Sequence, residues 1–257
     1  MPPISGITIT YNEEAHIAAC IASLRQVCDD VVVVDSHSTD RTAEIAREQG
    51  ARVVEQDFLG DGPQRNVAVD HADHDWILCL DADERADEEM VRTIRGLPLD
   101  PEVAYAFNRK SFVGRHWIDG PGFYPDHLTR LYNRQRATYE DRRMHATVVA
   151  PRVERVGGHI LHYTYDDLSD WIGSIDGLSS WGARQLFESG RRPSKWAPTW
   201  RALAAGVRQL VLRGGIFRGL DGRTIAMTSM FHTYMKYLKL NELHERAREE
   251  RSNGSPD

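Results

Sequence analysis

The sequence predicts an α/β fold, in which a mostly parallel sheet with an antiparallel extension is followed by a helical region. Over the first hundred residues, short β-branched apolar runs alternate with segments of helical spacing. Such alternation is typical of βαβ units around a parallel sheet. Residues 103 to 163 instead hold short alternating runs broken by glycines, and residues 167 to 250 keep a helical spacing. These two stretches predict antiparallel strands with long loops, and then helices.

The first four elements alternate strand and helix. Ile4 to Thr10 is short and β-branched, which favours a strand, and Glu13 to Leu24 has apolar residues at helical spacing. The run Val31 to Val34 is apolar without interruption, as expected of a parallel strand that is buried on both faces. A helix is expected after it, up to about Gln49, because Gly50 is a helix stop.

The parallel part of the sheet continues to about residue 97. We expect strand, helix, strand and helix, in that order, at Ala51 to Glu55, Pro63 to Ala72, Trp76 to Leu80 and Asp87 to Leu97. In sheets of this kind, ligands bind at the carboxyl ends of the strands. That rule places Tyr11, Asp35 and Asp81 on one rim, although they are far apart in the sequence.

The antiparallel extension completes the predicted sheet. Its strands are expected at Tyr105 to Phe112, Leu128 to Tyr132 and Thr147 to Val156, with a break at Gly157-Gly158. Long loops in a compact domain usually serve a site. The domains that follow from this pattern are a sheet domain over residues 1–165, a helical region over residues 166–250 and a disordered tail over residues 251–257.

Composition limits the classes of function. The formal net charge of −6 gives no reason to expect a nucleic acid partner. Cys20, Cys28 and Cys79 have no metal-ligand spacing, and we expect them to be reduced thiols. The first residues lack the features of a signal peptide, and no stretch has the ~18 apolar residues of a spanning helix. We therefore expect a cytoplasmic protein that is soluble or peripherally attached to a membrane.

Carboxylates follow three of the expected strands. Asp81 and Asp83 flank the small Ala82 directly after one of them, and two carboxylates so placed suit a hard divalent cation that also binds a diphosphate. The alternative is a turn with helix-capping residues. The segments Tyr11 to Glu13 and Asp35 favour the cation, because crowded acidic groups on one rim are costly unless a cation binds there. Asp35 alone is equally compatible with a helix cap.

Four motifs resemble those of glycosyltransferase family 2 in order and spacing. They are Thr10 to Glu14, Val34 to Asp40, Gln64 to Asn66 and Leu80 to Glu84. The resemblance implies the GT-A fold and a reaction that inverts the anomeric centre. Later segments are similar to a branch that includes the bacterial glucosyltransferases of the lipopolysaccharide inner core; they include Gly122 to Asp126, Thr129 to Tyr132, Met144-His145 and Leu161 to Tyr165.

The resemblance also implies a role for each matching residue. The residues that would bind the nucleotide sugar are Thr10, Tyr11 and Glu13 at the base and ribose, Asp35 and Ser38 in the motif that binds the base, Arg65 near base or phosphate, and Asp81, Ala82 and Asp83 at the ribose and metal. Asp83 would be the metal ligand. The implied donor is a UDP-sugar and the implied cofactor is Mg²⁺ or Mn²⁺, which offsets charge on the departing diphosphate.

The catalytic base is where this sequence departs from the branch. The branch usually carries His-Glu where this chain has His145-Ala146, and the glutamate is a plausible base there. Either another group takes that role, or the enzyme is impaired, or the residue was altered by design. Asp126, in a glycine-rich loop expected to roof the site, is our first candidate for the base, and His145 is the second, followed by Glu140 and Asp141. Each also has a structural interpretation, Asp126 as a loop cap and His145 as a hydrogen-bonded histidine.

A strongly basic segment lies in the helical region. Between Arg191 and Arg223 there are eight Lys or Arg residues and one acidic residue, a net charge of +7 that leaves −13 for the rest of the chain. Tryptophans and aliphatic residues are interleaved with these cations, a pattern that suits an interfacial helix on an anionic membrane. A helix that packs on the catalytic domain with a solvated basic face fits the pattern equally well.

The sequence as a whole predicts a metal-dependent hexosyltransferase. It would move a hexose, glucose by resemblance, from UDP to a saccharide or lipid-linked acceptor such as lipopolysaccharide core, at the inner face of the plasma (inner) membrane. Two alternatives remain: a nucleotide-sugar-binding protein with impaired catalysis, for which Ala146 argues, and a nucleotidyltransferase. A nucleotidyltransferase would be expected to have a glycine-rich phosphate loop after its first strand, whereas this chain has Tyr11-Asn12-Glu13-Glu14 there.

Overall fold

The computed structural model describes residues 1–253, with side chains described as far as residue 249. The chain divides into two compact units. The sheet unit comprises Met1–Ser111 and Pro125–Thr164, and the helical unit comprises Phe112–Tyr124 and the chain from Tyr165 onward. The last helix continues to Asn253, so residues 251–253 of the expected disordered tail are helical, and residues 254–257 lie outside the described residues.

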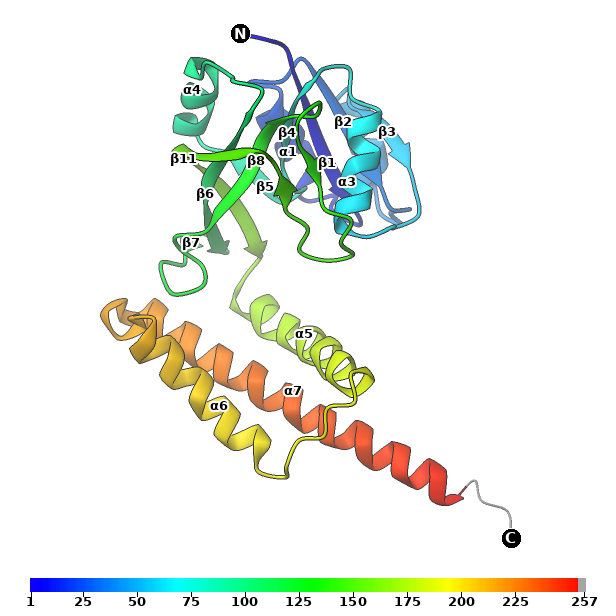
Figure 1. Cartoon of the computed structure of the whole chain (residues 1–257), viewed down its shortest axis with the longest axis vertical. Coiled ribbons are helices and arrows are strands. Elements are labelled where there is room, and N and C mark those ends of the chain that lie inside the picture. Colours follow the sequence, from blue (N-terminus) through cyan, green and yellow to red (C-terminus); the bar gives the residue numbers. More distant parts are fainter. Residues whose placement is uncertain (254–257) are drawn as a thin grey trace. The chain divides into compact units, whose positions relative to one another are not determined.

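Strands and helices alternate in the first part of the chain, and antiparallel strands follow (Figure 1). The strands are β1 (Ile4–Thr10), β2 (Asp30–Asp35), β3 (Arg52–Glu55), β4 (Trp76–Cys79), β5 (Glu84–Ala86), β6 (Val103–Val113), β7 (His116–Trp117), β8 (His127–Asn133), β9 (Thr138–Tyr139), β10 (Val148–Val149) and β11 (Arg152–Tyr165). The helices of the sheet unit are α1 (Ile17–Leu24), α2 (Thr42–Glu48), α3 (Asp61–Asp70) and α4 (Glu88–Gly96).

The main sheet has the strand order β3-β2-β1-β4-β8-β6-β11-β5. β1 pairs in parallel with β2 and β4, and β2 pairs in parallel with β3. β8 then pairs antiparallel with β4, so the extension begins next to the central strands. The α/β fold class expected from the sequence is confirmed. Because Thr10 is in register with Asp35, the chain leaves β1 and β2 at the same edge of the sheet.

The core lies on both faces of the sheet. Val31 and Val33 pack in the cluster that includes α1, while Val32 and Val34 pack in the cluster that includes Ala68 of α3. In Figure 1, α3 lies in front of the strands and α1 on the opposite face. The uninterrupted valine run of β2 is therefore buried on two sides, as expected of an inner parallel strand.

Two local expectations are wrong. The break expected at Gly157-Gly158 falls inside β11, and β5, which pairs with it, was not expected at all. The physical reason lies at Gly158, whose φ is +90° and whose hypothetical β-carbon would lie 2.3 Å from the backbone of Met90. The glycine therefore lets the strand pass against α4, and it does not mark a loop.

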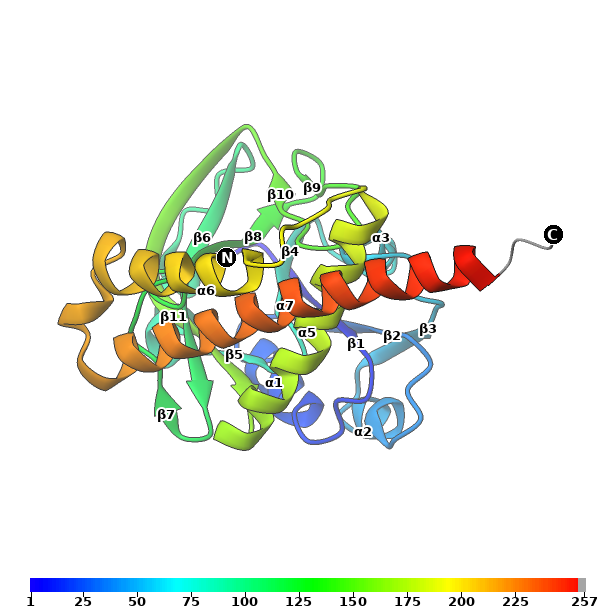
Figure 2. The ribbon, with the colours of Figure 1, turned by 90° about the horizontal axis from the view of Figure 1, so that it is seen from below.

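The helical unit is built on one long helix. Its elements are α5 (Leu168–Glu188), α6 (Ala197–Val207), the π-helical turn η1 (Arg208–Leu212), the 3-10 turn η2 (Gly215–Phe217) and α7 (Gly219–Asn253). α5 and α6 both pack along α7 (Figures 1 and 2). Ile118, Trp171 and Ile225 form its small core. Over the described residues, no helix combines the length and the apolar character needed to cross a membrane.

Candidate functional site

A pocket of about 570 Å³ lies at the carboxyl ends of the central parallel strands. It is lined by seven of the nine residues predicted to bind a nucleotide sugar: Thr10, Tyr11, Glu13, Arg65, Asp81, Ala82 and Asp83. Ile9, Ser36 and Phe58 complete the lining, and sequence reasoning did not name these three. The pocket occupies the place that the strand-end rule gives to ligands in parallel sheets.

The two remaining predicted residues, Asp35 and Ser38, support the wall of the pocket and do not line it. The buried Asp35 carboxylate accepts hydrogen bonds from the Ser38 backbone nitrogen at 2.8 Å and from its hydroxyl at 2.5 Å. The Ser38 hydroxyl in turn accepts from the backbone nitrogen of Asn12 at 2.9 Å, where φ is +55°. This chain of bonds ties the loop after β2 to the loop that carries Tyr11.

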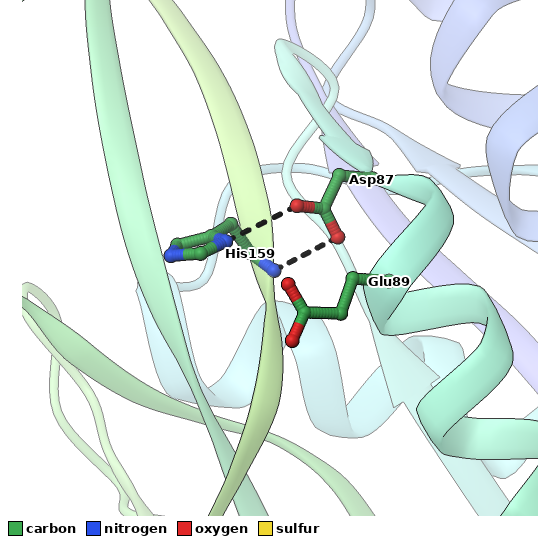
Figure 3. Close-up of side chains that lie close together, drawn as sticks. All are labelled: Asp87, Glu89 and His159. Atoms are coloured by element: carbon green, nitrogen blue, oxygen red, sulfur yellow. Dashed lines mark hydrogen bonds and ion pairs between the residues drawn. The ribbon is translucent and has the colours of Figure 1, made fainter.

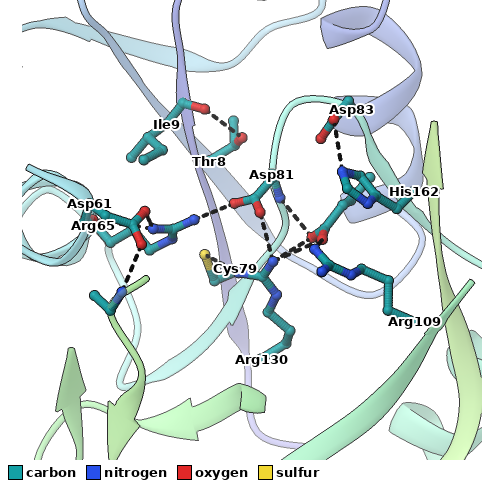
Figure 4. A network of polar contacts seen from close by, with 12 residues as sticks. Thr8, Ile9, Asp61, Arg65, Cys79, Asp81, Asp83, Arg109, Arg130 and His162 are labelled. Atoms are coloured by element: carbon teal, nitrogen blue, oxygen red, sulfur yellow. Dashed lines mark hydrogen bonds and ion pairs between the residues drawn. The ribbon is translucent and has the colours of Figure 1, made fainter. Parts of the chain in front are cut away.

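Asp81 lies between two arginines, as Figure 4 shows. Its Oδ1 contacts Arg65 at 2.5 Å, and its Oδ2 contacts Arg130 at 2.7 Å. Burial alone would raise the pKa of Asp81, but the two guanidinium groups hold that pKa well below its usual range. Burial also opposes the charge on each arginine, yet the Asp81 carboxylate keeps the pKa of both above the ordinary value. The two arginines therefore favour the anionic form of Asp81, which lines the pocket.

The ion pairs continue away from the pocket along the antiparallel strands. Arg130 also contacts the fully buried Glu84 at 2.8 Å, and Glu84 lies 3.4 Å from Arg109. Glu84 accepts from the backbone nitrogen of Asp81 as well, at 3.0 Å, which fixes the turn after β4. Sequence reasoning missed these roles of Glu84, Arg109 and Arg130, although Glu84 and Arg130 lie inside noted motifs.

Asp83 meets a histidine from the antiparallel extension. Its Oδ2 lies 3.0 Å from Nε2 of His162 (Figure 4). Nδ1 of the same ring lies 2.9 Å from the Thr164 hydroxyl and 3.3 Å from the Ser111 hydroxyl. A carboxylate and an imidazole held by hydroxyl groups suit a divalent cation such as Mn²⁺. Two protein ligands would leave positions for water and diphosphate oxygens. The donor set at Asp83 therefore fits the expected cofactor.

A second pocket, of about 270 Å³, shares Arg65 and Asp81 with the first. His145 and Ala146 both line it, so residue 146, where the branch usually has glutamate, faces a cavity. Asp61 lines it too: one carboxylate oxygen accepts from the Ala146 backbone nitrogen at 2.9 Å, and the other contacts Arg65. Asp61 was not singled out from the sequence, where an isolated Asp between two glycines looks like a turn.

Asp126, the first candidate for the catalytic base, lines neither of these two pockets. Its Oδ2 lies 2.8 Å from the guanidinium group of Arg109, and its backbone nitrogen donates to Asn108 at 2.7 Å. The carboxylate is therefore held at the far end of the ion-pair network. The structure brings His145, but not Asp126, to a cavity beside the first pocket.

A separate group of Asp87, Glu89 and His159 has its ligand atoms within 4.8 Å of one another (Figure 3). The Asp87 carboxylate accepts from the backbone nitrogens of Met90 at 2.7 Å and His159 at 3.0 Å, and its other oxygen lies 3.1 Å from the His159 ring. Asp87 is thus the N-cap of α4 and joins that helix to β11. These contacts account for the positions of Asp87 and His159 without an ion.

Comparisons with known proteins agree with this geometry. A family model described as glycosyl transferase family 2 matches residues 5–153. The chain is 28% identical over 254 residues to an uncharacterized glycosyltransferase of Rickettsia bellii, covering 93% of this chain and 86% of that one. It is also 28% identical over 263 residues to the lipopolysaccharide core biosynthesis glycosyltransferase LpsC of Rhizobium meliloti, covering 94% and 93%.

A solved structure was also found to be similar. The crystal structure of S. aureus TarS 1-349 in complex with UDP-GlcNAc matches 95% of this chain and 92% of that one, with a TM-score of 0.47 at 17% identity. The family match, by contrast, spans more than half of the chain and includes every residue that lines the first pocket. The chain therefore belongs to glycosyl transferase family 2, and its sheet unit has the GT-A fold.

Proposed function

We propose that this glycosyltransferase transfers a hexose, glucose in the first instance, with inversion from a UDP-sugar to a saccharide or lipid-linked acceptor such as lipopolysaccharide core. The observation that carries the proposal is the strand-end pocket, which Tyr11, Arg65 and the Asp81-Ala82-Asp83 turn line together. The similarity to LpsC over nearly the full length of both chains supports the acceptor class.

The pocket offers chemically different groups to the parts of a UDP-sugar. Tyr11, 58% exposed at the rim, presents an aromatic face for the base. Arg65 lies between the two pockets and supplies positive charge for the diphosphate. Asp83 and His162 would hold a divalent cation, and that cation, when bound, offsets the charge that develops on the leaving diphosphate.

The second pocket is the proposed place of the acceptor hydroxyl, because it adjoins the donor pocket at Arg65 and Asp81. The hydroxyl oxygen forms a bond to the anomeric carbon, the bond from that carbon to the diphosphate breaks, and the hydroxyl proton passes to a base. We assign that base to Asp61. It is a carboxylate in this pocket beside Ala146, whereas Asp126 lies outside it and Asp81 is held by two arginines.

A transfer assay with several donors tests the proposal. UDP-glucose, UDP-galactose, UDP-GlcNAc and GDP-mannose would each be incubated with Mn²⁺ and a truncated lipopolysaccharide, and the product mass and the anomeric configuration would be recorded. We expect a gain of one hexose from a UDP-sugar, with an inverted linkage. A product formed only from GDP-mannose, or a retained linkage, would contradict the proposal.

The second candidate function is a nucleotide-sugar-binding protein with impaired catalysis, and Ala146 is the observation that favours it. Its distinguishing result is UDP-sugar binding without hydrolysis or transfer. Slow hydrolysis of the UDP-sugar with Mn²⁺ in the absence of acceptor would instead show that the catalytic groups are complete enough to act on water.

A further inference from the structure

Helix α6 presents its large apolar side chains to solvent. Five of them recur at intervals of three or four residues along α6 and η1, and their exposed fractions range from 51% to 77%: Trp196, Trp200, Leu203, Val207 and Val211. The opposite face of α6 carries small buried residues, among them Ala202, Ala205 and Gly206. A β-carbon at Gly206 would lie 2.4 Å from the Met230 sulfur, so this face fits closely on α7. Packing within the helical unit therefore leaves the apolar stripe uncovered.

The turn between α6 and α7 extends the stripe. Leu212, Ile216, Phe217 and Leu220 are all at least 64% exposed, and Phe217 is 88% exposed. The turn is closely built: a β-carbon at Gly222 would lie 1.8 Å from the carbonyl oxygen of Gly215, and Gly214 has a φ of +71°. The backbone thus holds the apolar side chains outward in a fixed arrangement. Isolated exposed apolar residues are ordinary, but a continuous stripe marks an interaction surface.

Cations surround this apolar surface. Lys195, Arg208 and Arg213 are exposed along the stripe and its turn. Asp221, the single acidic residue between Arg191 and Arg223, is engaged by His116 at 2.9 Å and by the Asp119 backbone at 3.1 Å. The net charge of +7 in this segment selects an anionic partner. A second copy of the chain would bring the same cations against these.

We infer that the α6–α7 hairpin, residues 196–220, docks this unit on an anionic phospholipid surface. The apolar stripe and the Phe217 turn enter the boundary between headgroups and acyl chains, and the arginines and Lys195 contact lipid phosphates. The hairpin lies in the plane of the membrane, in keeping with the absence of any spanning helix over the described residues. The inference rests on the proposed function, because it gives a family 2 enzyme access to an acceptor held in a membrane.

Vesicle sedimentation of the full-length protein tests this inference. Vesicles of phosphatidylcholine alone would be compared with vesicles containing 3:1 phosphatidylcholine and phosphatidylglycerol. We expect binding to the anionic vesicles, weak binding to the neutral ones, and weaker binding in higher salt, because screening reduces the attraction. The double variant Ile216→Ser/Phe217→Ser should bind at least about 10-fold more weakly. Equal binding to neutral and anionic vesicles, or no binding, would overturn the inference.

Matched control variants distinguish binding through this surface from non-specific binding of the protein to vesicles. Val207→Ser, at a 56% exposed position of the stripe, should weaken vesicle binding, while Val153→Ser, at a 48% exposed position of the sheet unit, should not. UDP affinity and UDP-sugar hydrolysis in lipid-free buffer should be unchanged in these three variants. If the wild-type protein binds vesicles but neither binds UDP nor hydrolyses the UDP-sugar, the result contradicts the proposed function and leaves the membrane inference intact. A dimer that Ile216→Ser/Phe217→Ser converts to monomer would reassign the surface to self-association.

Discussion

At the scale of single residues, the electrostatics of the first pocket depend on how charge is distributed around Asp81 and Asp83. Asp81 forms ion pairs with two guanidinium groups, those of Arg65 and Arg130. Among the ion pairs of the described residues, Asp83 has one partner, the imidazole of His162. The two carboxylates of one motif therefore have different surroundings. This difference is compatible with the roles that the resemblance implies, Asp81 at the nucleotide and Asp83 at the cation.

The cation assignment predicts the effect of removing its ligand. Asp83→Ala should lower transfer by about 10²-fold or more, because the charge on the leaving diphosphate is no longer offset. Excess EDTA should have the same effect on the wild-type protein, and added Mn²⁺ should restore it. The unfolding temperature of the variant should stay near that of the wild type. Full turnover in EDTA would rule out metal-dependent transfer.

The base assignment predicts a contrast between two aspartates that are each paired with an arginine. Asp61→Asn should lower acceptor transfer by about 10²–10⁴-fold, the usual size of general-base catalysis, while Asp126→Asn should have a small effect. UDP affinity should change little in either variant. The measurement is the turnover rate on the true acceptor.

Two outcomes would reassign the base. A large loss in Asp126→Asn with normal Asp61→Asn would return the role to Asp126. If the wild-type protein is nearly inactive and Ala146→Glu raises its activity, the missing glutamate is the base. If none of these substitutions changes the activity, His145 is the remaining candidate.

At the scale of elements, the sequence was most informative where one physical cause acts alone. The valines of β2 must be buried on two faces, and the strand-end motifs must meet because parallel strands end together. The strand-end rule brought Tyr11 and Asp81 to one pocket, whereas Asp35, which it placed on the same rim, does not line that pocket. The resemblance named the other five predicted residues that line it. Arg109, Arg130 and His162 were harder, because they come from antiparallel strands whose register no local pattern fixes.

The glycine pair Gly157-Gly158 was also interpreted wrongly, because its role depends on a contact that is distant in sequence. Gly157-Gly158 was expected to break a strand, since glycine weakens strands and marks turns. In the structure the close approach of β11 to α4 requires glycine at position 158. A contact between segments that are distant in sequence leaves no signature in either segment alone.

That contact predicts a stability effect. Gly158→Ala should lower the free energy of unfolding by about 2–3 kcal/mol, because alanine resists the positive φ and its β-carbon would meet the backbone of Met90. Gly96→Ala is the matched control: nothing lies within 4 Å of its position, and the change should stay within about 1 kcal/mol. Urea unfolding measures both. Equal effects would mean that β11 does not pass as closely to α4 as described.

At the scale of the whole molecule, the two units have different proposed roles: the sheet unit carries out the transfer, and the helical unit binds the membrane. The sheet unit holds both pockets and the ion-pair network, and the helical unit holds the α6–α7 hairpin. The charge is divided as well, since residues 191–223 carry +7 and the rest of the chain carries −13. A basic surface on an otherwise acidic chain is expected to orient the protein at an anionic membrane.

The central claim is that the strand-end pocket binds the nucleotide of a UDP-sugar, and calorimetric titration with UDP in the presence of Mn²⁺ tests it most directly. We expect saturable binding to the wild-type protein, weaker by about 1–3 kcal/mol in Tyr11→Ala, because the base loses its aromatic contact. Tyr234→Ala, at a 40% exposed tyrosine of the helical unit, should bind UDP as the wild type does. UDP affinity that is absent, or that Tyr11→Ala leaves unchanged, would contradict the account.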